Sequence, residues 1–171
     1  MKVFIQARTS SSRLQGKVLK NIIDEKHTLD LITSKLLTLF SKKRLVILTS
    51  NDKSDDLIQN YCREKKINYF RGSLKNVSKR FFEALKIHKC KYFMRISADS
   101  PLIDVRIIKE LVKYSKKKKF DIITNVNPRS FPKGQSIEIV KSQTFIDNFK
   151  KFKLKKHFEH VTNFFYKHEK R

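Results

Sequence analysis

Near its N-terminus the chain reads Val3-Phe4-Ile5-Gln6-Ala7 and continues with Arg8-Thr9-Ser10-Ser11-Ser12-Arg13-Leu14-Gln15-Gly16-Lys17. Residues 3–7 form a short apolar run with β-prone side chains, which is typical of a buried strand. The residues that follow are small, polar or basic, as is usual in a loop. The N-terminus therefore predicts a strand over 3–7 and a loop over 8–17.

The same alternation of strand and helix signals continues along the chain. Leu29, Ile32, Leu36 and Phe40 recur at spacings of three and four, which predicts a helix over 28–40. Further helices are expected over 52–65, 76–88, 104–114 (after an Asp104 cap) and from 142 onward. Further strands are expected over 44–50, 68–70, 92–96, 120–124 and 136–140.

This order predicts an α/β fold, a Rossmann-like and mostly parallel sheet with helices on both faces. A length of 171 residues suits a single domain over 1–171. In such sheets ligands bind beyond the carboxyl ends of the strands. The loops after the first, third, fourth and fifth expected strands are therefore the places to look for a site.

Composition narrows the class of protein. No apolar run approaches the roughly 20 residues of a membrane span, and the N-terminus lacks a secretory signal, so no membrane partner and a cytoplasmic location are expected. The two cysteines have no metal-site or disulfide-framework spacing. The net charge, 40 − 16 = +24, would suit a nucleic-acid binder. However, lysine far outnumbers arginine, which matches the codon bias of an AT-rich genome, so a nucleic-acid partner is not expected.

The chain has only three glycines, Gly16, Gly72 and Gly134, and each is expected in a loop after a strand. The loop over 8–17 combines serines, a Gly-Lys step and two arginines. Backbone N–H groups and cations of this kind suit a triphosphate, although the Walker pattern is absent. A serine-rich turn with exposed basic residues is the alternative interpretation.

Motifs along nearly the whole chain resemble one family in order and spacing. They are Ile5-Gln6-Ala7-Arg8 with Ser11, Arg13-Leu14, Gly16-Lys17 and Leu19; Phe70-Arg71-Gly72-Ser73 with Val77 and Arg80; Arg95-Ile96, Ala98-Asp99 and Pro101-Leu102-Ile103-Asp104; Thr124-Asn125, Gly134 and Glu138; and Glu159-His160-Val161-Thr162. The chain is similar to the cytidylyltransferases that activate acidic sugars, especially the spore-coat polysaccharide biosynthesis protein F group. The resemblance implies the nucleotide-diphospho-sugar transferase type of fold.

The resemblance also implies roles for individual residues. Lys17, Arg13 and Asp99 are the expected catalytic residues, with Asp99 as the ligand of a Mg²⁺ cofactor; a turn residue before Pro101 is the alternative for Asp99. The expected nucleotide-binding residues are Arg8, Ser11, Ser12, Gly16, Arg71, Ser73 and Arg80. For Arg71, Ser73 and Arg80 the alternative is a surface position beside a helix start. Glu138 and His160 are sugar-binding candidates, with a structural hydrogen bond as the alternative.

The implied reaction transfers CMP from CTP to a sugar hydroxyl, with release of pyrophosphate, for surface polysaccharide. Gln15 and Ser10 depart from the family's usual proline and glycine, and the chain stops at Arg171, short of the family's C-terminal extension. A catalytically reduced nucleotide-binding homologue is therefore the second hypothesis, and a lysine-rich nucleic-acid binder, with Phe149, Phe152 and Phe158 beside basic residues, is the third. The resemblance leaves a homodimer open.

Overall fold

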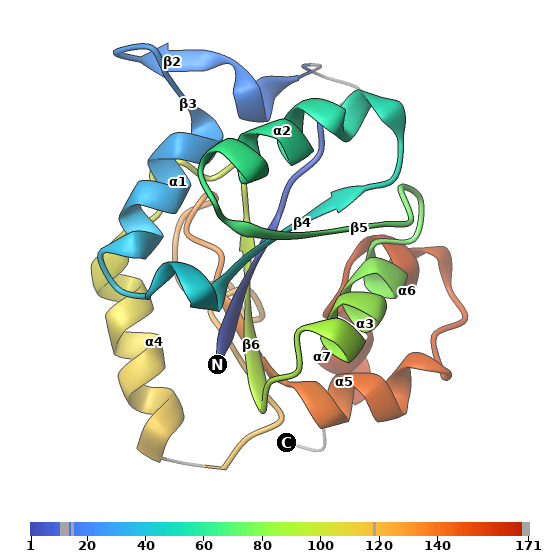
Figure 1. Cartoon of the computed structure of the whole chain (residues 1–171). Coiled ribbons are helices and arrows are strands. Elements are labelled where there is room, and N and C mark those ends of the chain that lie inside the picture. Colours follow the sequence, from blue (N-terminus) through green and yellow to red (C-terminus); the bar gives the residue numbers. More distant parts are fainter. Residues whose placement is uncertain (11–13, 15, 118, 169–171) are drawn as a thin grey trace.

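The computed structural model describes residues 1–10, 14, 16–117 and 119–168 and consists of a six-stranded sheet between helices (Figure 1). The strands are β1 (Lys2–Gln6), β4 (Leu45–Ser50), β5 (Asn68–Gly72), β6 (Tyr92–Ser97), β7 (Ile122–Thr124) and β8 (Glu138–Lys141), with a separate hairpin of β2 (Asn21–Ile23) and β3 (Lys26–His27). The helices are α1 (Thr28–Leu37), α2 (Asp56–Glu64), α3 (Val77–Ile87), α4 (Val105–Lys117), α5 (Ser142–Phe149), α6 (Lys155–Glu159) and α7 (Asn163–His168).

The sheet has the order β5-β4-β1-β6-β8-β7. Neighbouring strands among β5, β4, β1 and β6 are parallel, whereas β8 is antiparallel to β6 and to β7. The connection over 125–137 carries no helix, and a parallel crossover usually needs one, so β7 and β8 pair antiparallel. The expected Rossmann-like, mostly parallel sheet is confirmed, with an antiparallel edge that the sequence did not predict.

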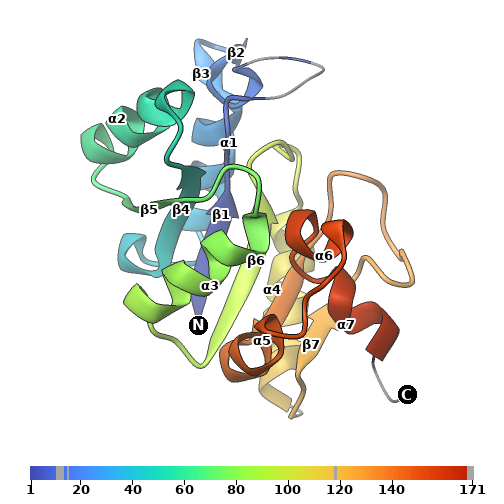
Figure 2. The same ribbon diagram turned by 90° about the vertical axis from the view of Figure 1, so that its right-hand side faces the viewer.

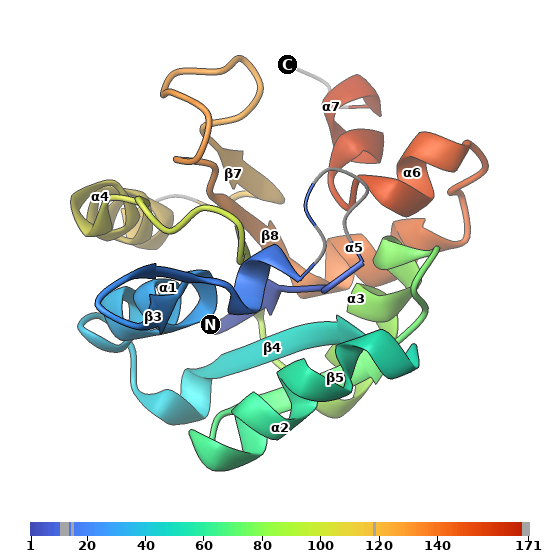
Figure 3. The ribbon, with the colours of Figure 1, turned by 90° about the horizontal axis from the view of Figure 1, so that it is seen from above.

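Helices cover both faces of the sheet because its strands are apolar on both sides. One core cluster joins Val3 and Ile5 of β1 to buried residues of α1, α2 and α4. A second cluster joins Phe4 of β1 and Phe93 of β6 to α3, α5 and the C-terminal segment. From above, α1 and α4 lie on one side of the strands and α3, α5 and α6 on the other (Figure 3). Figure 2 shows the side with α3, α5, α6 and α7.

Several element boundaries differ from the expected ones for local reasons. The helix expected to reach residue 40 ends at Leu37, and Thr38 Oγ1 then donates to the Lys35 carbonyl at 2.7 Å. The helix expected from 52 begins as a short 3-10 helix over Lys53–Asp55, and α2 follows it. Asp104 accepts from the Arg106 amide at 2.8 Å just before α4, as expected of a cap.

Two further differences concern turns and glycines. The β2–β3 hairpin was not expected, because its turn residues Asp24 and Glu25 have positive φ values of 47° and 58° without a glycine signal. Gly72 was expected in a loop, but it is the last residue of β5. Its φ is not positive. The position requires glycine because the side chains of Phe70 and Arg80 lie against the place where a Cβ would be.

The chain order reverses at β1, since β4 and β5 follow on one side of it and β6 on the other. At such a switch point the connections leave in opposite directions and open a crevice at the carboxyl ends of the strands. The fold therefore predicts a ligand site between the ends of β1 and β6. The loop after β1 and the segment after Ser97 meet there, and the Ala98 amide donates to the Gln6 carbonyl at 2.9 Å.

Candidate active site

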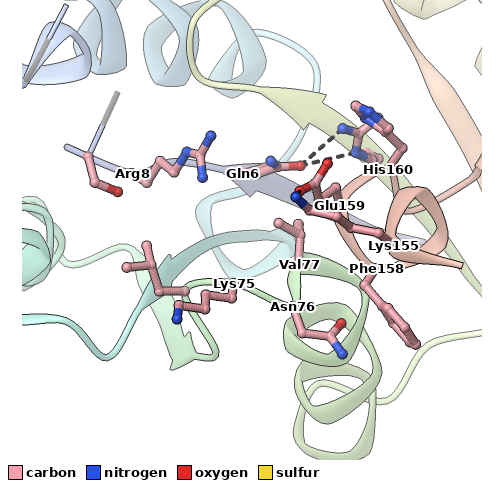
Figure 4. A pocket seen from close by; sticks show the side chains of 12 residues that line it. Gln6, Arg8, Lys75, Asn76, Val77, Lys155, Phe158, Glu159 and His160 are labelled. Atoms are coloured by element: carbon pink, nitrogen blue, oxygen red, sulfur yellow. Dashed lines mark hydrogen bonds and ion pairs between the residues drawn. The ribbon is translucent and has the colours of Figure 1, made fainter. Parts of the chain in front are cut away.

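A cleft of about 890 Å³ opens at this end of the sheet, on the face covered by α3 and α6 (Figure 4). Its floor comes from the strands, one wall from the start of α3 and the opposite wall from α6. The lining residues are Gln6, Arg8, Ser10, Leu74, Lys75, Asn76, Val77, Arg95, Lys155, Phe158, Glu159 and His160. Four of them are lysine or arginine and one is a carboxylate, so the cleft favours an anionic ligand.

Lys17 and Asp99 lie together beyond the ends of β1 and β6. Lys17 Nζ is 2.7 Å from Asp99 Oδ2, although the two residues are 82 positions apart in sequence. Both side chains keep partial exposure, at 30% and 41%. Ser97 Oγ donates to the second carboxylate oxygen at 2.6 Å. The structure thus brings together two of the three residues expected to be catalytic.

The pKa of Asp99 lies below its ordinary value. Burial by itself would raise this pKa, but the hydrogen bonds from Lys17 and Ser97 and the charge of Lys17 outweigh it. The carboxyl group is therefore ionised at neutral pH and carries the charge that a metal ligand needs. Mg²⁺ usually binds through one or two carboxylates together with substrate phosphates and water.

A single carboxylate beside the loop over 8–17, which is predicted to bind phosphate, would fit Mg²⁺ that arrives with a nucleotide. Within the described part of the chain, no cluster of three or more histidine, cysteine or acidic side chains could hold a metal by itself. Asp99 as a Mg²⁺ ligand stays a prediction.

The loop after β1 is closed at its base. The Gly16 amide donates to the Thr9 carbonyl at 2.8 Å, and Gly16 has a φ of 70°, which favours glycine. Thr9 is itself fixed by the buried Asp55, which accepts from the Thr9 amide at 2.7 Å. Arg8 is exposed and lines the cleft. Ser11, Ser12 and Arg13 lie outside the described residues, so their expected roles stay predictions.

Arg71 is turned toward α2 rather than into the cleft. Its Nη1 is 2.7 Å from Asp56 Oδ1 and also donates to Gln59, while Nε donates to the Ser50 carbonyl at 2.9 Å. These contacts join β5 to the end of β4 and to α2. Arg71 is not among the residues that line the cleft, and direct nucleotide contact by Arg71 stays a prediction.

Arg80 is fully buried, so the surface alternative is wrong for this residue. Its Nε and Nη2 donate to the Ser73 carbonyl at 3.1 and 2.8 Å, and burial lowers its pKa to about 10. Ser73 Oγ accepts from the Asn76 amide at 3.0 Å. Arg80 and Ser73 therefore brace the turn from β5 into α3, which forms a wall of the cleft. Their contact with nucleotide stays a prediction.

Glu138 is buried at the start of β8. Its carboxylate pairs with Arg95 Nη1 and accepts from the Thr162 and Tyr166 hydroxyl groups. Burial would raise its pKa, but the Arg95 charge and these hydrogen bonds hold the pKa below its ordinary value. The structure thus shows the structural hydrogen bonds that were the alternative for Glu138, and sugar contact by Glu138 stays a prediction. His160 lines the cleft beside Glu159 (Figure 4), so sugar contact by His160 stays a prediction.

Sequence reasoning did not assign a site role to several residues of the cleft, among them Gln6, Arg95, Lys75 and Lys155. Gln6 and Arg95 carried a signal, because polar side chains inside short apolar strands need a partner or a ligand. Lys75 and Lys155 carried none, since both lie among many other lysines. The aromatic residues proposed for nucleic acid, Phe149, Phe152 and Phe158, all pack in or against the second core cluster, and Phe158 also lines the cleft.

A Gly72→Ala substitution should destabilise the turn that Arg80 braces. An added Cβ would lie 2.9 Å from Phe70 Cε1 and 3.0 Å from Arg80 Cγ. We expect a loss of about 1–3 kcal/mol of unfolding free energy, as for other overpacked sites. Urea denaturation measures this loss. Gly134→Ala is a comparison with no contact within 4 Å but a φ of 93°. An unchanged stability in Gly72→Ala would contradict the close packing.

No helix in the described ranges is long and apolar enough to cross a bilayer.

Comparisons with known proteins identify relatives of the chain and of its fold. A family model described as cytidylyltransferase matches residues 3–171. An uncharacterized protein of Methanocaldococcus jannaschii is 33% identical over 162 residues, which are 95% of this chain and 65% of that protein. The spore coat polysaccharide biosynthesis protein SpsF of Bacillus subtilis is 29% identical over 149 residues, 84% of this chain and 60% of SpsF. The chain thus spans less than two thirds of the length of both curated relatives.

Solved structures have the same fold. A cytidylyltransferase from Leptospira borgpetersenii superposes with a TM-score of 0.90 at 25% identity, over 98% of this chain and 71% of that chain. The CMP:2-keto-3-deoxy-manno-octonic acid synthetase, solved in complex with CTP, superposes with a TM-score of 0.69 at 14% identity, over 95% and 83% of the two chains. The family model covers nearly every residue, and the Lys17–Asp99 pair and the cleft occupy the switch point of the sheet. The chain belongs to the cytidylyltransferase family.

Proposed function

We propose that this protein transfers CMP from CTP to a sugar, and that the sugar is an acid used in surface polysaccharide. The observation that carries the proposal is the contact of Lys17 with Asp99 at 2.7 Å beyond the ends of β1 and β6. The two side chains would provide, side by side, a cation for the phosphates and a carboxylate for the Mg²⁺ bound to them. The likeness to SpsF, a spore coat polysaccharide biosynthesis protein, supports the choice of pathway, and the likeness to the synthetase complexed with CTP supports the choice of nucleotide.

The reaction needs no covalent enzyme intermediate. A hydroxyl oxygen of the sugar attacks the α-phosphorus of CTP and forms a new P–O bond. The bond from the α-phosphorus to the bridging oxygen breaks, and pyrophosphate leaves with the electron pair. The proton of the attacking hydroxyl passes to solvent. Mg²⁺, when bound, would neutralise charge on the phosphate oxygens.

The chain's own contribution is positioning and charge. Lys17 would bind a phosphate oxygen. When the Lys17 ammonium group turns from Asp99 to the phosphate, the Asp99 carboxylate would become free to bind the metal. Arg8 at the mouth of the loop adds a second cation. Lys75 and Lys155, on opposite walls of the cleft, provide charge for an anionic sugar. The cleft volume of about 890 Å³ is within the range of small-molecule sites.

Nucleotide selectivity is the first expected result. CTP with Mg²⁺ should raise the melting temperature by roughly 5–11 °C at about 100 times its Kd, because such a ligand adds about 2.7 kcal/mol. UTP, ATP, GTP and single-stranded DNA should give smaller shifts. Differential scanning fluorimetry at two salt concentrations measures this. Equal shifts for every polyanion that fade with salt would contradict the proposal, since the net charge of +24 alone would explain them.

Turnover is tested by pyrophosphate release from CTP with a panel of acidic and neutral sugars, including 2-keto-3-deoxy-manno-octonic acid. Release with sugar acids alone supports the proposal in full. CTP-selective binding without release from any sugar would favour a nucleotide-binding homologue instead.

A further inference from the structure

A row of polar side chains crosses the floor of the cleft on three adjacent strands. Phe4, Phe93 and Val140 belong to the core cluster on this face. Two residues further toward the cleft on the same strands stand Gln6, Arg95 and Glu138. Side chains two apart in a strand share a face, so the apolar core changes to a polar row where the cleft begins.

Glu138 fixes Arg95, its neighbour in this row. Arg95 and Glu138 are direct partners in the β6–β8 register, and Arg95 Nη1 pairs with the carboxylate. The Glu138 side chain is 3% exposed, and the hydroxyl groups of Thr162 and Tyr166 donate to its other oxygen. A buried carboxylate whose two oxygens both have hydrogen-bond partners is held in one orientation. It holds the guanidinium of Arg95 in place.

Arg95 in turn fixes the amide of Gln6. Nε and Nη2 of Arg95 approach the same atom of Gln6, at 3.2 and 3.0 Å. A guanidinium has only donors, so the atom facing it must be the amide oxygen, Oε1. Figure 4 shows both contacts ending on Gln6 at the floor, with Glu159 and His160 nearby. The amide nitrogen Nε2 then faces away from Arg95, and no described residue accepts from it.

We propose that Gln6 is a specificity-determining residue that donates from Nε2 to an acceptor oxygen, a carboxylate or hydroxyl oxygen, of the sugar substrate, and that Arg95 and Glu138 are positioning residues for it. The sugar is favoured over the nucleotide because the row extends from β1 toward β8 and α7. Lys17 and Asp99, the residues for the phosphates, lie in the segments beyond the strand ends. This inference rests on the proposed function for its substrate.

The test compares Gln6→Met with the unchanged chain. Methionine keeps the length of the side chain but removes both N–H donors. The KM for the sugar acid that releases pyrophosphate should rise about 10-fold, as for one lost hydrogen bond, while kcat changes less than about threefold. The Kd for CTP with Mg²⁺, from isothermal titration calorimetry, should stay within about twofold. Glu138→Gln and Tyr166→Phe should raise the same KM by smaller factors, because they loosen the Arg95 position.

Two variants control for loss of stability. Tyr61→Phe makes the same change as Tyr166→Phe at a buried tyrosine, whose oxygen lies 2.9 Å from Thr33 Oγ1 on the far face of the sheet. Gln143→Met makes the same side-chain change on α5, where the amide donates to Asp147 at 2.7 Å. Neither residue lines the cleft, so both variants should keep the sugar KM and the CTP Kd.

The outcomes separate this inference from the proposed function. Pyrophosphate release with an unchanged sugar KM in Gln6→Met would overturn the role of Gln6 and leave the function standing. A weakened CTP Kd with the same sugar KM would assign the floor to the nucleotide and also overturn it. If no sugar releases pyrophosphate, the binding of 2-keto-3-deoxy-manno-octonic acid to the CTP-loaded protein is measured instead. Binding that Gln6→Met weakens supports the role of Gln6 without the reaction. Absence of binding overturns both the role of Gln6 and the proposed function.

Discussion

A Lys17→Ala variant should lose about 10³-fold in kcat/KM for CTP-dependent pyrophosphate release while remaining folded. Lys17 is the described cation in contact with Asp99, at 2.7 Å, and alanine removes the charge that would offset the triphosphate. Loss of one preorganised charge or donor at a reacting group typically costs about 10²–10³ in rate. Loss of nucleotide affinity adds to that cost.

Lys20→Ala is the matched control. Lys20 is exposed, carries the same charge and follows Lys17 by three residues at the end of the short 3-10 helix over Lys17–Leu19. It should keep normal kinetics, so a drop confined to Lys17→Ala cannot come from net charge. Steady-state kinetics with calorimetry of CTP binding measures both. Normal CTP binding by Lys17→Ala would contradict the site assignment.

Asp99 extends this prediction to pH. Its pKa is lowered in the folded protein, so its ionised form contributes stability above the ordinary aspartate pKa, and that contribution is lost as the pH falls through the lower folded value. At neutral pH the carboxylate stays charged. Asp99→Asn should therefore abolish Mg²⁺-dependent CTP binding at pH 7, with little change in melting temperature because the pair is partly exposed.

An Asp55→Ala variant should lose about 3 kcal/mol of unfolding free energy, or roughly 6–12 °C in melting temperature. Asp55 is fully buried and accepts from the amides of Thr9 and Ser50, at 2.7 and 2.9 Å, and from both of their hydroxyl groups. Alanine removes the acceptor of both amides and of the Ser50 hydroxyl in the interior, while the Thr9 hydroxyl keeps the Ser54 carbonyl at 2.8 Å. Because Thr9 begins the loop over 8–17, nucleotide binding should weaken as well.

The lowered pKa of Asp55 determines how its contribution to stability changes with pH. Burial would raise the pKa, but the hydrogen bonds from Ser50 and Thr9 outweigh it and lower the pKa. The stabilisation is therefore present above the ordinary aspartate pKa of about 3.9 and is lost as the pH falls through the lower folded value. The stability difference between the unchanged chain and Asp55→Ala should shrink in acid.

Asp52→Ala is the control for Asp55→Ala. Asp52 is an exposed N-cap that accepts from the Ser54 amide at 2.9 Å, so its loss should be clearly smaller. Chemical denaturation of the three proteins at pH 7 and pH 2 tests the prediction, because pH 2 lies below the ordinary aspartate pKa. Equal stability of Asp55→Ala and Asp52→Ala at pH 7 would contradict the anchoring role of Asp55.

The sequence was informative where structure depends on local periodicity. The spacing of Leu29, Ile32 and Leu36 predicted α1, and the apolar run over 44–50 predicted β4, because neighbouring residues alone determine these patterns. The motif order predicted the family. The antiparallel edge and the β2–β3 hairpin lacked such a signal, since one depends on pairing between distant strands and the other on a turn without glycine.

The amino-acid sequence by itself determined the alternation of strands and helices apart from the β2–β3 hairpin, and with it the end of the sheet where a ligand is expected. The tertiary structure alone decided which polar residues meet there. Lys17 and Asp99 are 82 positions apart, and Arg95 lies 89 positions from Gln6. The family motifs implied the same role for Arg71 and Arg80, yet Arg71 contacts α2 and Arg80 braces the turn into α3. The physical reason is that local pattern fixes a residue's face and element, whereas the partner of a buried charge depends on how distant strands are brought into register.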